Sequence, residues 1–229
     1  MKKTFLSAFV KTLPVMGTYI ILGIGFGMLL EKGGYGVLWA FAMGVFIYAG
    51  AMQYVAVGLL TSGVAALAAA FTTFTVNARH FFYGVSMIDR YQDTGRYKPY
   101  LYFALTDETY SLVCTDDIPE GVDRNRFYFL LSLLNQCYWV FGCVTGSLLG
   151  AASAFDSTGI EFVMTALFVT VFLEQWMSGK NHLFSLTGVG LSLVCLMLFG
   201  SDYFLIPSMI ISILFISLYR KKHIKKEAE

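Results

Sequence analysis

Polar side chains that could carry chemistry are rare in this sequence, and they interrupt long apolar stretches. If those stretches lie in a bilayer, an ionisable group at its centre costs about 2.5–3.5 kcal/mol on insertion scales, so each such group needs a reason to be there. Together these residues offer amides, a guanidinium and carboxyl groups, which suit the binding of a small charged solute or a proton. They are Gln53, Asn77, Arg79, His80, Asp107, Glu108, Asn135, Gln136 and Glu174.

The group around Arg79 lies between an apolar segment of small residues and a second, shorter apolar run. Two interpretations compete. In the first, Arg79 and His80 mark a membrane interface, with Arg79 extending toward water and His80 hydrogen-bonded. In the second, a helix breaks near Asn77, and Arg79 offers its planar guanidinium to a substrate carboxylate or to an acidic partner.

Asp107 and Glu108 lie in the middle of an apolar segment, between Thr106 and Thr109. Neighbouring residues on a helix point about 100° apart, so only one of the two carboxyl groups can face a given cavity. One interpretation places the segment at an interface with both acids solvated. The other buries at least one carboxyl group, which then takes part in proton coupling or pairs with Arg79 or with a substrate ammonium.

The remaining polar residues support weaker predictions. Gln53 follows Gly50 and is expected to supply neutral hydrogen bonds near a helix break. Asn135 and Gln136 are expected to hold neighbouring helices together, and Glu174 to be a lone carboxylate at a helix end. The sequence has no nucleophile elbow, zinc-protease motif, phosphate loop or paired cysteine and histidine ligands, so we expect neither an enzyme nor a cofactor or metal.

The composition indicates the kind of fold that holds these polar residues in position. Hydrophobic residues make up 57% of the chain and charged residues 14%, against about 25% charged residues in soluble domains. Lipid leaves backbone groups no partner outside their own helix, and the alternating polarity of a β-barrel is absent. We therefore predict an all-α integral membrane protein, a polytopic bundle of six to eight helical segments at residues 13–30, 36–60, 64–88, 99–115, 127–154, 160–177, 182–200 and 203–219.

The whole chain, residues 1–229, is predicted to form one transmembrane domain, with a basic N-terminus (1–12), the membrane bundle (13–219) and a basic tail (220–229). Basic residues favour the cytoplasmic side, which predicts cytoplasmic termini. Either all eight segments cross, or the third and seventh dip in and return so that six cross, and charge does not decide between them. The match of Gln53-Tyr54 with Gln175-Trp176 is either coincidence or the trace of an inverted repeat with broken helices.

Glycine spacing gives two further expectations. Small residues every four positions let helices approach closely, and this face is expected to be available to another membrane subunit: Gly142, Gly146 and Gly150. In the first segment glycines recur every second residue, which indicates either a bend or unwound point or plain tight packing: Gly23, Gly25 and Gly27.

Three short motifs occur in order in the first half of the chain: Tyr48-Ala49-Gly50-Ala51-Met52-Gln53, then Asn77-Ala78-Arg79-His80 followed by Tyr83-Gly84, then Thr106-Asp107-Glu108-Thr109. In this order and at these intervals they resemble the AzlC family, the large subunits of branched-chain amino acid exporters. The resemblance extends in length and segment layout from about residue 13 to residue 219. Ala78 stands where the family usually shows leucine.

The resemblance implies a secondary active exporter of leucine, isoleucine, valine and sometimes methionine, a permease of the cytoplasmic membrane that works with a small AzlD-type membrane subunit. The alternatives are a channel for another small solute and a structural membrane subunit. Carried over by position, the expected substrate-binding residues are Gly50, Gln53, Asn77, Arg79 and His80. The expected coupling residues are Asp107 and Glu108.

Overall fold

The computed structural model describes residues 2–115, 118–152 and 182–204, together with isolated positions between 162 and 219. The regular secondary structure within these ranges is helical. The chain divides into two compact units, Met1–Thr165 and Ala166–Glu229. The predicted echo at Gln175, the carboxyl group of Glu174 and the basic tail at 220–229 lie outside the described residues.

The first unit contains two long helices and several short ones. Within the described ranges, α1 and α8 are the helices long and apolar enough to cross a membrane, which agrees with the predicted helical membrane protein. In chain order the elements are α1 (Lys2–Lys32), α2 (Val37–Phe46), α3 (Gly50–Thr61), α4 (Ala66–Ser86), α5 (Ile88–Tyr91), η1 (Gly95–Tyr97), α6 (Lys98–Phe103), α7 (Asp107–Cys114) and α8 (Arg124–Ala152). The second unit contains α10 (Leu183–Tyr203).

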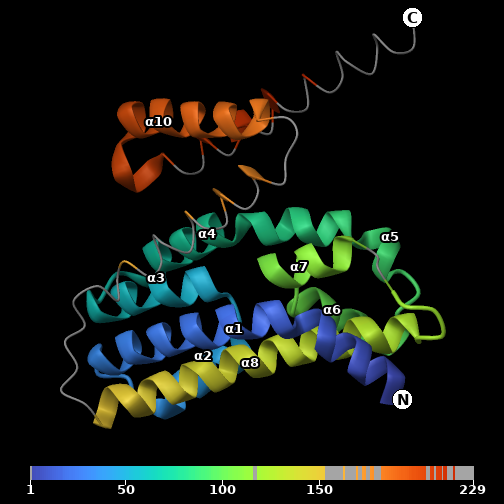
Figure 1. The fold of residues 1–229 in the computed structure, drawn as a ribbon. Helices are drawn as coiled ribbons and strands as arrows, with labels where there is room; N and C mark the ends of the chain where they lie inside the picture. Colours follow the sequence, from blue (N-terminus) through green and yellow to red (C-terminus); the bar gives the residue numbers. More distant parts are fainter. Residues whose placement is uncertain are drawn as a thin grey trace, which may run out of the picture. The chain divides into compact units, whose positions relative to one another are not determined.

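α1 and α8 lie side by side and run in the same direction (Figure 1). Their glycines set the spacing: a Cβ atom placed on Gly23 would lie 2.9 Å from the Cα of Gly142, and one on Gly27 would lie 2.9 Å from the carbonyl carbon of Gly146. The interpretation of tight packing is therefore confirmed, and α1 has no unwound point. The expectation that the α8 glycines face another subunit is wrong, because α1 already covers them.

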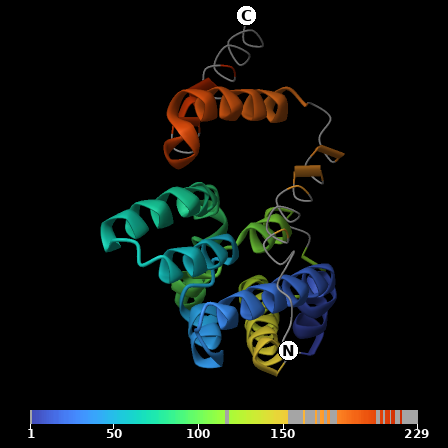
Figure 2. The same ribbon diagram turned by 90° about the vertical axis from the view of Figure 1, so that its left-hand side faces the viewer.

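The second apolar segment folds back on itself as a helical hairpin. α2 starts and α3 ends beside the C-terminal end of α1, where the Tyr35 hydroxyl donates to the Leu60 carbonyl (3.4 Å). The chain reverses at residues 47–49, where Tyr48 has a φ of 43°, a left-handed conformation that is rare outside glycine. α2 packs on α8, as Figure 2 shows. The helix break predicted near Gln53 is confirmed.

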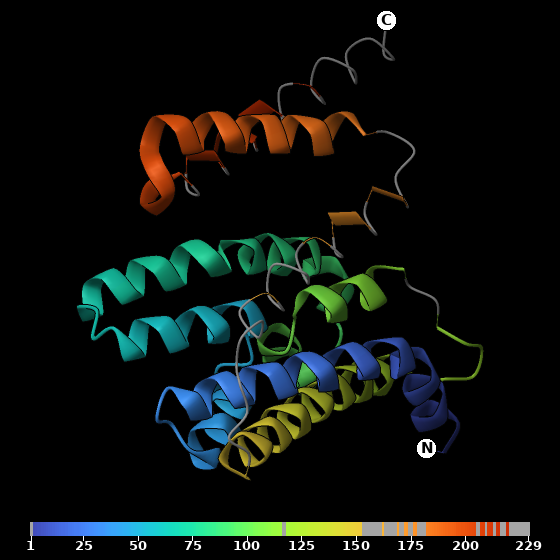
Figure 3. The same ribbon diagram turned by 60° about the vertical axis from the view of Figure 1, so that its left-hand side comes forward.

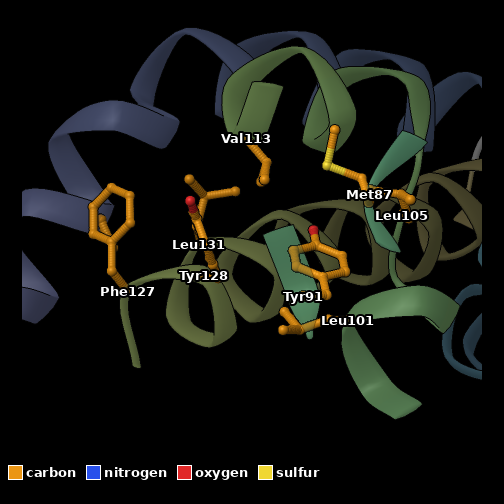
Figure 4. Packing of buried hydrophobic residues seen from close by; sticks show 9 residues of the cluster. Met87, Tyr91, Leu101, Leu105, Val113, Phe127, Tyr128 and Leu131 are labelled. Carbon is orange, nitrogen blue, oxygen red and sulfur yellow. The ribbon is translucent and has the colours of Figure 1, made fainter. Parts of the chain in front are cut away.

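The fourth apolar segment makes a second hairpin from the opposite end of the bundle. α6 starts beside α8, where the rings of Tyr97 and Phe129 are 4.8 Å apart. α7 ends beside α1, where the Lys11 ammonium donates to the Thr115 hydroxyl (3.1 Å). A buried apolar cluster holds this hairpin in place (Figure 4): Ala8, Met87, Tyr91, Leu101, Leu105, Val113, Phe127, Tyr128 and Leu131.

α4 is one uninterrupted helix that lies along α3 (Figure 3). The prediction that a helix breaks near Asn77 is therefore wrong. No glycine or proline lies between Ala66 and Tyr83. The threonines of this stretch satisfy their hydroxyl groups inside the helix, as Thr75 does by donating to the Phe71 carbonyl (2.8 Å). Local polarity alone does not break a helix when the helix itself supplies the partners.

Neither predicted topology matches this arrangement, since the segments that fold back are the second and the fourth rather than the third. One consequence is that the two ends of the first unit differ in their number of basic residues. Lys32 lies at the end of the first unit where α1 stops. Apart from Arg79, which pairs with Asp107 in the interior, the other basic residues of the first unit lie at the end where α1 begins: Lys2, Lys3, Lys11, Arg90, Arg96, Lys98, Arg124 and Arg126.

Candidate functional site

The tips of the two hairpins meet between the middles of α1, α4 and α8. The ring of Tyr48 at the first tip lies 6.4 Å from the ring of Phe103 at the second. Tyr19, from the middle of α1, places its ring 6.5 Å from that of Tyr48. The turns at which the two hairpins reverse thus lie in the same interior region, halfway along the long helices.

The first tip is held by an aromatic side chain from α8. Trp139 donates its indole N–H to the Oε1 atom of Gln53 (2.9 Å). The same ring covers Gly50, where a Cβ atom would lie only 3.1 Å from its Cη2 atom. Gln53 is fully buried. A side chain at position 50 would therefore press on the Trp139 ring, and glycine lets the two pack closely.

The second tip is a capped helix start. The Thr106 hydroxyl accepts the backbone N–H of Thr109 (3.3 Å) at the N-terminus of α7, the arrangement of an N-cap. Asn135 donates to the Thr109 hydroxyl (3.0 Å) and so joins α8 to α7. Asp107 and Glu108 occupy the first turn of α7, where the positive end of the helix dipole favours negative charge.

The two neighbouring carboxyl groups point to different partners, as their angular separation on a helix requires. Asp107 Oδ2 lies 2.9 Å from Arg79 Nη1 on α4, and each of these side chains is 28% exposed. Glu108 Oε2 accepts the hydroxyl of Tyr19 on α1 (2.8 Å). Of the alternatives for Arg79, pairing with an acid is the one observed. Glu108 has no salt bridge within the described ranges.

The other predicted site residues lie around this ion pair. His80 Nδ1 lies 3.2 Å from the carbonyl of Asn77 one turn earlier on α4. The His80 ring packs against Tyr83, with centroids 5.9 Å apart, and Tyr83 stacks on Tyr110 of α7 at 4.5 Å. The structure therefore brings Asn77, Arg79 and His80 together with α7, whereas Gln53 and Gly50 belong to the opposing tip.

The sequence interpretation missed the aromatic residues that join the tips to the long helices. Tyr19 and Trp139 are both buried, but in sequence they look like any aromatic residue of an apolar segment. The expectation that Asn135 and Gln136 hold helices together is confirmed. Gln136 accepts the Tyr100 hydroxyl (2.6 Å) from α6 and donates to the Val45 carbonyl (3.0 Å) of α2.

Several buried polar atoms near the two tips have no hydrogen-bond partner among the described residues. They include one donor and three acceptors: Gln53 Nε2, Asn77 Oδ1, Asp107 Oδ1 and Asn135 Oδ1. Buried polar atoms in proteins almost always have partners. A donor and an anionic acceptor in one region suit a ligand that itself carries both an acceptor and a donor. The described residues include no cluster of metal-binding side chains.

The comparisons with known proteins also indicate a membrane transport protein. The sequence profile of the family described as "AzlC protein" matches residues 14–152. The chain is 41% identical to the "Branched-chain amino acid transport protein AzlC" of Bacillus subtilis over 97% of its length and 88% of the relative. It is 42% identical to an "Uncharacterized membrane protein" of Helicobacter pylori over 96% of each chain. The "Inner membrane protein YgaZ" of Escherichia coli is 27% identical over 76% of this chain and 74% of the relative. No solved structure matches.

Proposed function

The chain belongs to the AzlC family, and on this premise we propose that it exports branched-chain amino acids across the cytoplasmic membrane as a secondary active carrier. The relative from Bacillus subtilis carries branched-chain amino acid transport in its name. Leucine, isoleucine and valine are the proposed substrates, with methionine as a further one. The protein is proposed to be multi-pass, with its basic end in the cytoplasm.

The observation that carries this proposal is the meeting of two interrupted helices in the middle of the bundle. Tyr48 and Phe103 place the tips in contact, and unpartnered polar atoms surround them. Carriers that bind small solutes at the membrane midplane use such discontinuous helices, whose free ends supply charge and hydrogen bonds without a full polar channel. A channel would instead need a continuous lining for its ion or solute.

We assign different roles to the polar residues. Gly50, Gln53, Asn77, Arg79 and His80 are proposed to form the substrate site and its immediate support. Asp107, with one oxygen on Arg79 and the other unpartnered in the described chain, is placed to meet a substrate ammonium. Glu108, without a salt bridge in the described part, is proposed to carry the coupled proton, with Asp107 contributing charge beside it.

The small AzlD-type subunit remains part of the proposal. α1 covers the glycine face of α8, so this subunit has to bind elsewhere. Candidate apolar surface exists on α4, where Leu67, Phe74 and Phe81 are more than two-thirds exposed in the isolated chain. Lipid covers whatever the subunit leaves free.

Flux measurements in proteoliposomes separate the candidate functions. The full chain, reconstituted alone and with the small membrane protein encoded beside it, should move L-leucine with saturable kinetics and reject D-leucine. A channel would give flux that rises linearly with concentration and ignores stereochemistry. No flux in either preparation would leave only a structural role and would overturn the proposal.

A further inference from the structure

We propose that the N-terminus of α3 is the subsite for the substrate carboxylate, with the Gln53 amide as its side-chain donor. This inference rests on the proposed function and deepens it, because it fixes which end of the amino acid meets which hairpin. In this assignment the substrate carboxylate binds at the first tip. Arg79 holds Asp107 in place at the second tip.

The first turn of α3 offers backbone donors without a cap. Ala49 occupies the N-cap position and makes no side-chain hydrogen bond. In the described chain the N–H groups of Gly50, Ala51 and Met52 have no backbone acceptor, while the next N–H, that of Gln53, bonds to the Ala49 carbonyl (2.8 Å). Free N–H groups and the helix dipole together make such an end attractive to an anion.

One buried side chain at the same end carries an unused donor, which is the independent sign of a ligand. Gln53 is 0% exposed, and its Nε2 atom has no hydrogen-bond partner among the described residues. Trp139 fixes the orientation of the Gln53 amide: because its indole N–H donates to Oε1, Nε2 is left free to donate. The Trp139 ring also covers Gly50, so this amide lies close to the helix start.

The helix start at the other tip has the opposite electrostatic character. α7 is capped by Thr106 and carries Asp107 and Glu108 in its first turn. Arg79 is the nearby guanidinium, and it lies 2.9 Å from Asp107. A carboxylate is therefore favoured at α3, and an ammonium is favoured beside Asp107. A zwitterion bound between the tips would satisfy both.

The test uses Gln53→Glu, which keeps an oxygen for the Trp139 indole but replaces the free Nε2 donor with a second carboxylate oxygen. The full chain in nanodiscs is assayed by competition against radiolabelled L-leucine. The competitors are L-leucinol, which lacks the carboxylate, and 4-methylpentanoate, which lacks the ammonium. For the parent protein we expect leucine to compete well and leucinol hardly at all. For Gln53→Glu we expect leucine affinity to fall by at least about tenfold, as for loss of a hydrogen bond to a charged group, while leucinol competes at least as well as leucine.

Gln136→Glu is the matched control, because it adds the same charge at a buried α8 side chain whose two amide atoms are already engaged. It should retain the preference for leucine over leucinol. Gln53→Met, which removes the Nε2 donor without adding a charge, should weaken leucine more than leucinol and serves where Gln53→Glu does not fold. Equal competition by leucinol and leucine on the parent, or parent-like leucine affinity in a folded Gln53→Glu, would overturn the carboxylate subsite alone. A parent protein that neither binds nor moves leucine would overturn the proposed function with it.

Discussion

Arg79 Nη1 on the uninterrupted helix α4 lies 2.9 Å from Asp107 Oδ2 in the first turn of α7. This ion pair joins a continuous helix to the tip of a hairpin, and it lies where α7 also meets Tyr19 of α1 through Glu108. A carrier that alternates between two states needs contacts of this kind, which hold a broken helix in one position and can be exchanged in another.

The first prediction concerns this pair. Arg79→Gln and Asp107→Asn should each destabilise the folded protein by about 1.5–3 kcal/mol, because each removes the charge that compensates its partly buried partner. The double variant should recover most of the lost thermal stability, since it leaves no uncompensated charge. None of the three should accumulate leucine. Thermal unfolding in detergent and leucine uptake check both parts, and additive losses in the double variant would show that the pair is not coupled.

The second prediction separates coupling from binding. Glu108→Gln keeps an oxygen that can accept the Tyr19 hydroxyl but cannot take up or release a proton in the physiological range. Exchange of labelled for unlabelled leucine across proteoliposomes should survive, while leucine movement driven by a pH gradient should be lost. If the variant responds to the gradient like the parent, the proton is carried elsewhere.

The third prediction tests the packing of α1 on α8. Gly27→Ala should destabilise the protein by about 1–3 kcal/mol, the usual cost of overpacking, because its Cβ atom would meet the backbone of α8. Gly17→Ala is the matched control on the same helix. A Cβ atom there has open space, and alanine favours the helix by about 1 kcal/mol over glycine. Equal unfolding temperatures for the two variants would contradict the glycine contact.

The fourth prediction tests the hairpin topology with single cysteines in a cysteine-free background. Lys32 and Ser62 flank the first hairpin and are exposed, so Lys32→Cys and Ser62→Cys should react with a membrane-impermeant maleimide from the same side. Asp93→Cys, in the exposed turn after α5, should react from the opposite side. If each apolar segment crossed once, Lys32 and Ser62 would instead lie on opposite sides.

Much of the local structure follows from the sequence, but the reversals do not. The apolar stretch 36–60 is long enough to cross a bilayer once, since about 20 helical residues suffice. Nothing in its composition distinguishes a crossing from a hairpin. Gly50 beside Gln53 does signal a weak point. At Asn77 the polar residues suggested a break that the helix avoids by satisfying its own hydroxyl groups.

The candidate site also follows from the sequence only in part. Residue type and spacing single out Arg79, Asp107 and Glu108, because charged groups are costly in an apolar segment. Which of them pair depends on the approach of α4 to α7, and that contact is set by the fold rather than by local pattern. Tyr19 and Trp139 carry no local signal, because aromatic residues that face lipid and those that hold a site are alike in sequence.

Chemical protection at the first tip tests the central claim most directly. Ala49 lies between Tyr48 and the first turn of α3 and is partly buried, so Ala49→Cys in a cysteine-free chain places a reactive thiol at the proposed site. With L-leucine at ten times its dissociation constant, modification by a small methanethiosulfonate reagent should slow about tenfold, because only the unoccupied protein reacts. D-leucine should have no effect, and Ser62→Cys should react at the same rate with and without leucine. An Ala49→Cys rate that L-leucine leaves unchanged, in protein that still transports it, would place the transport site away from the hairpin tips.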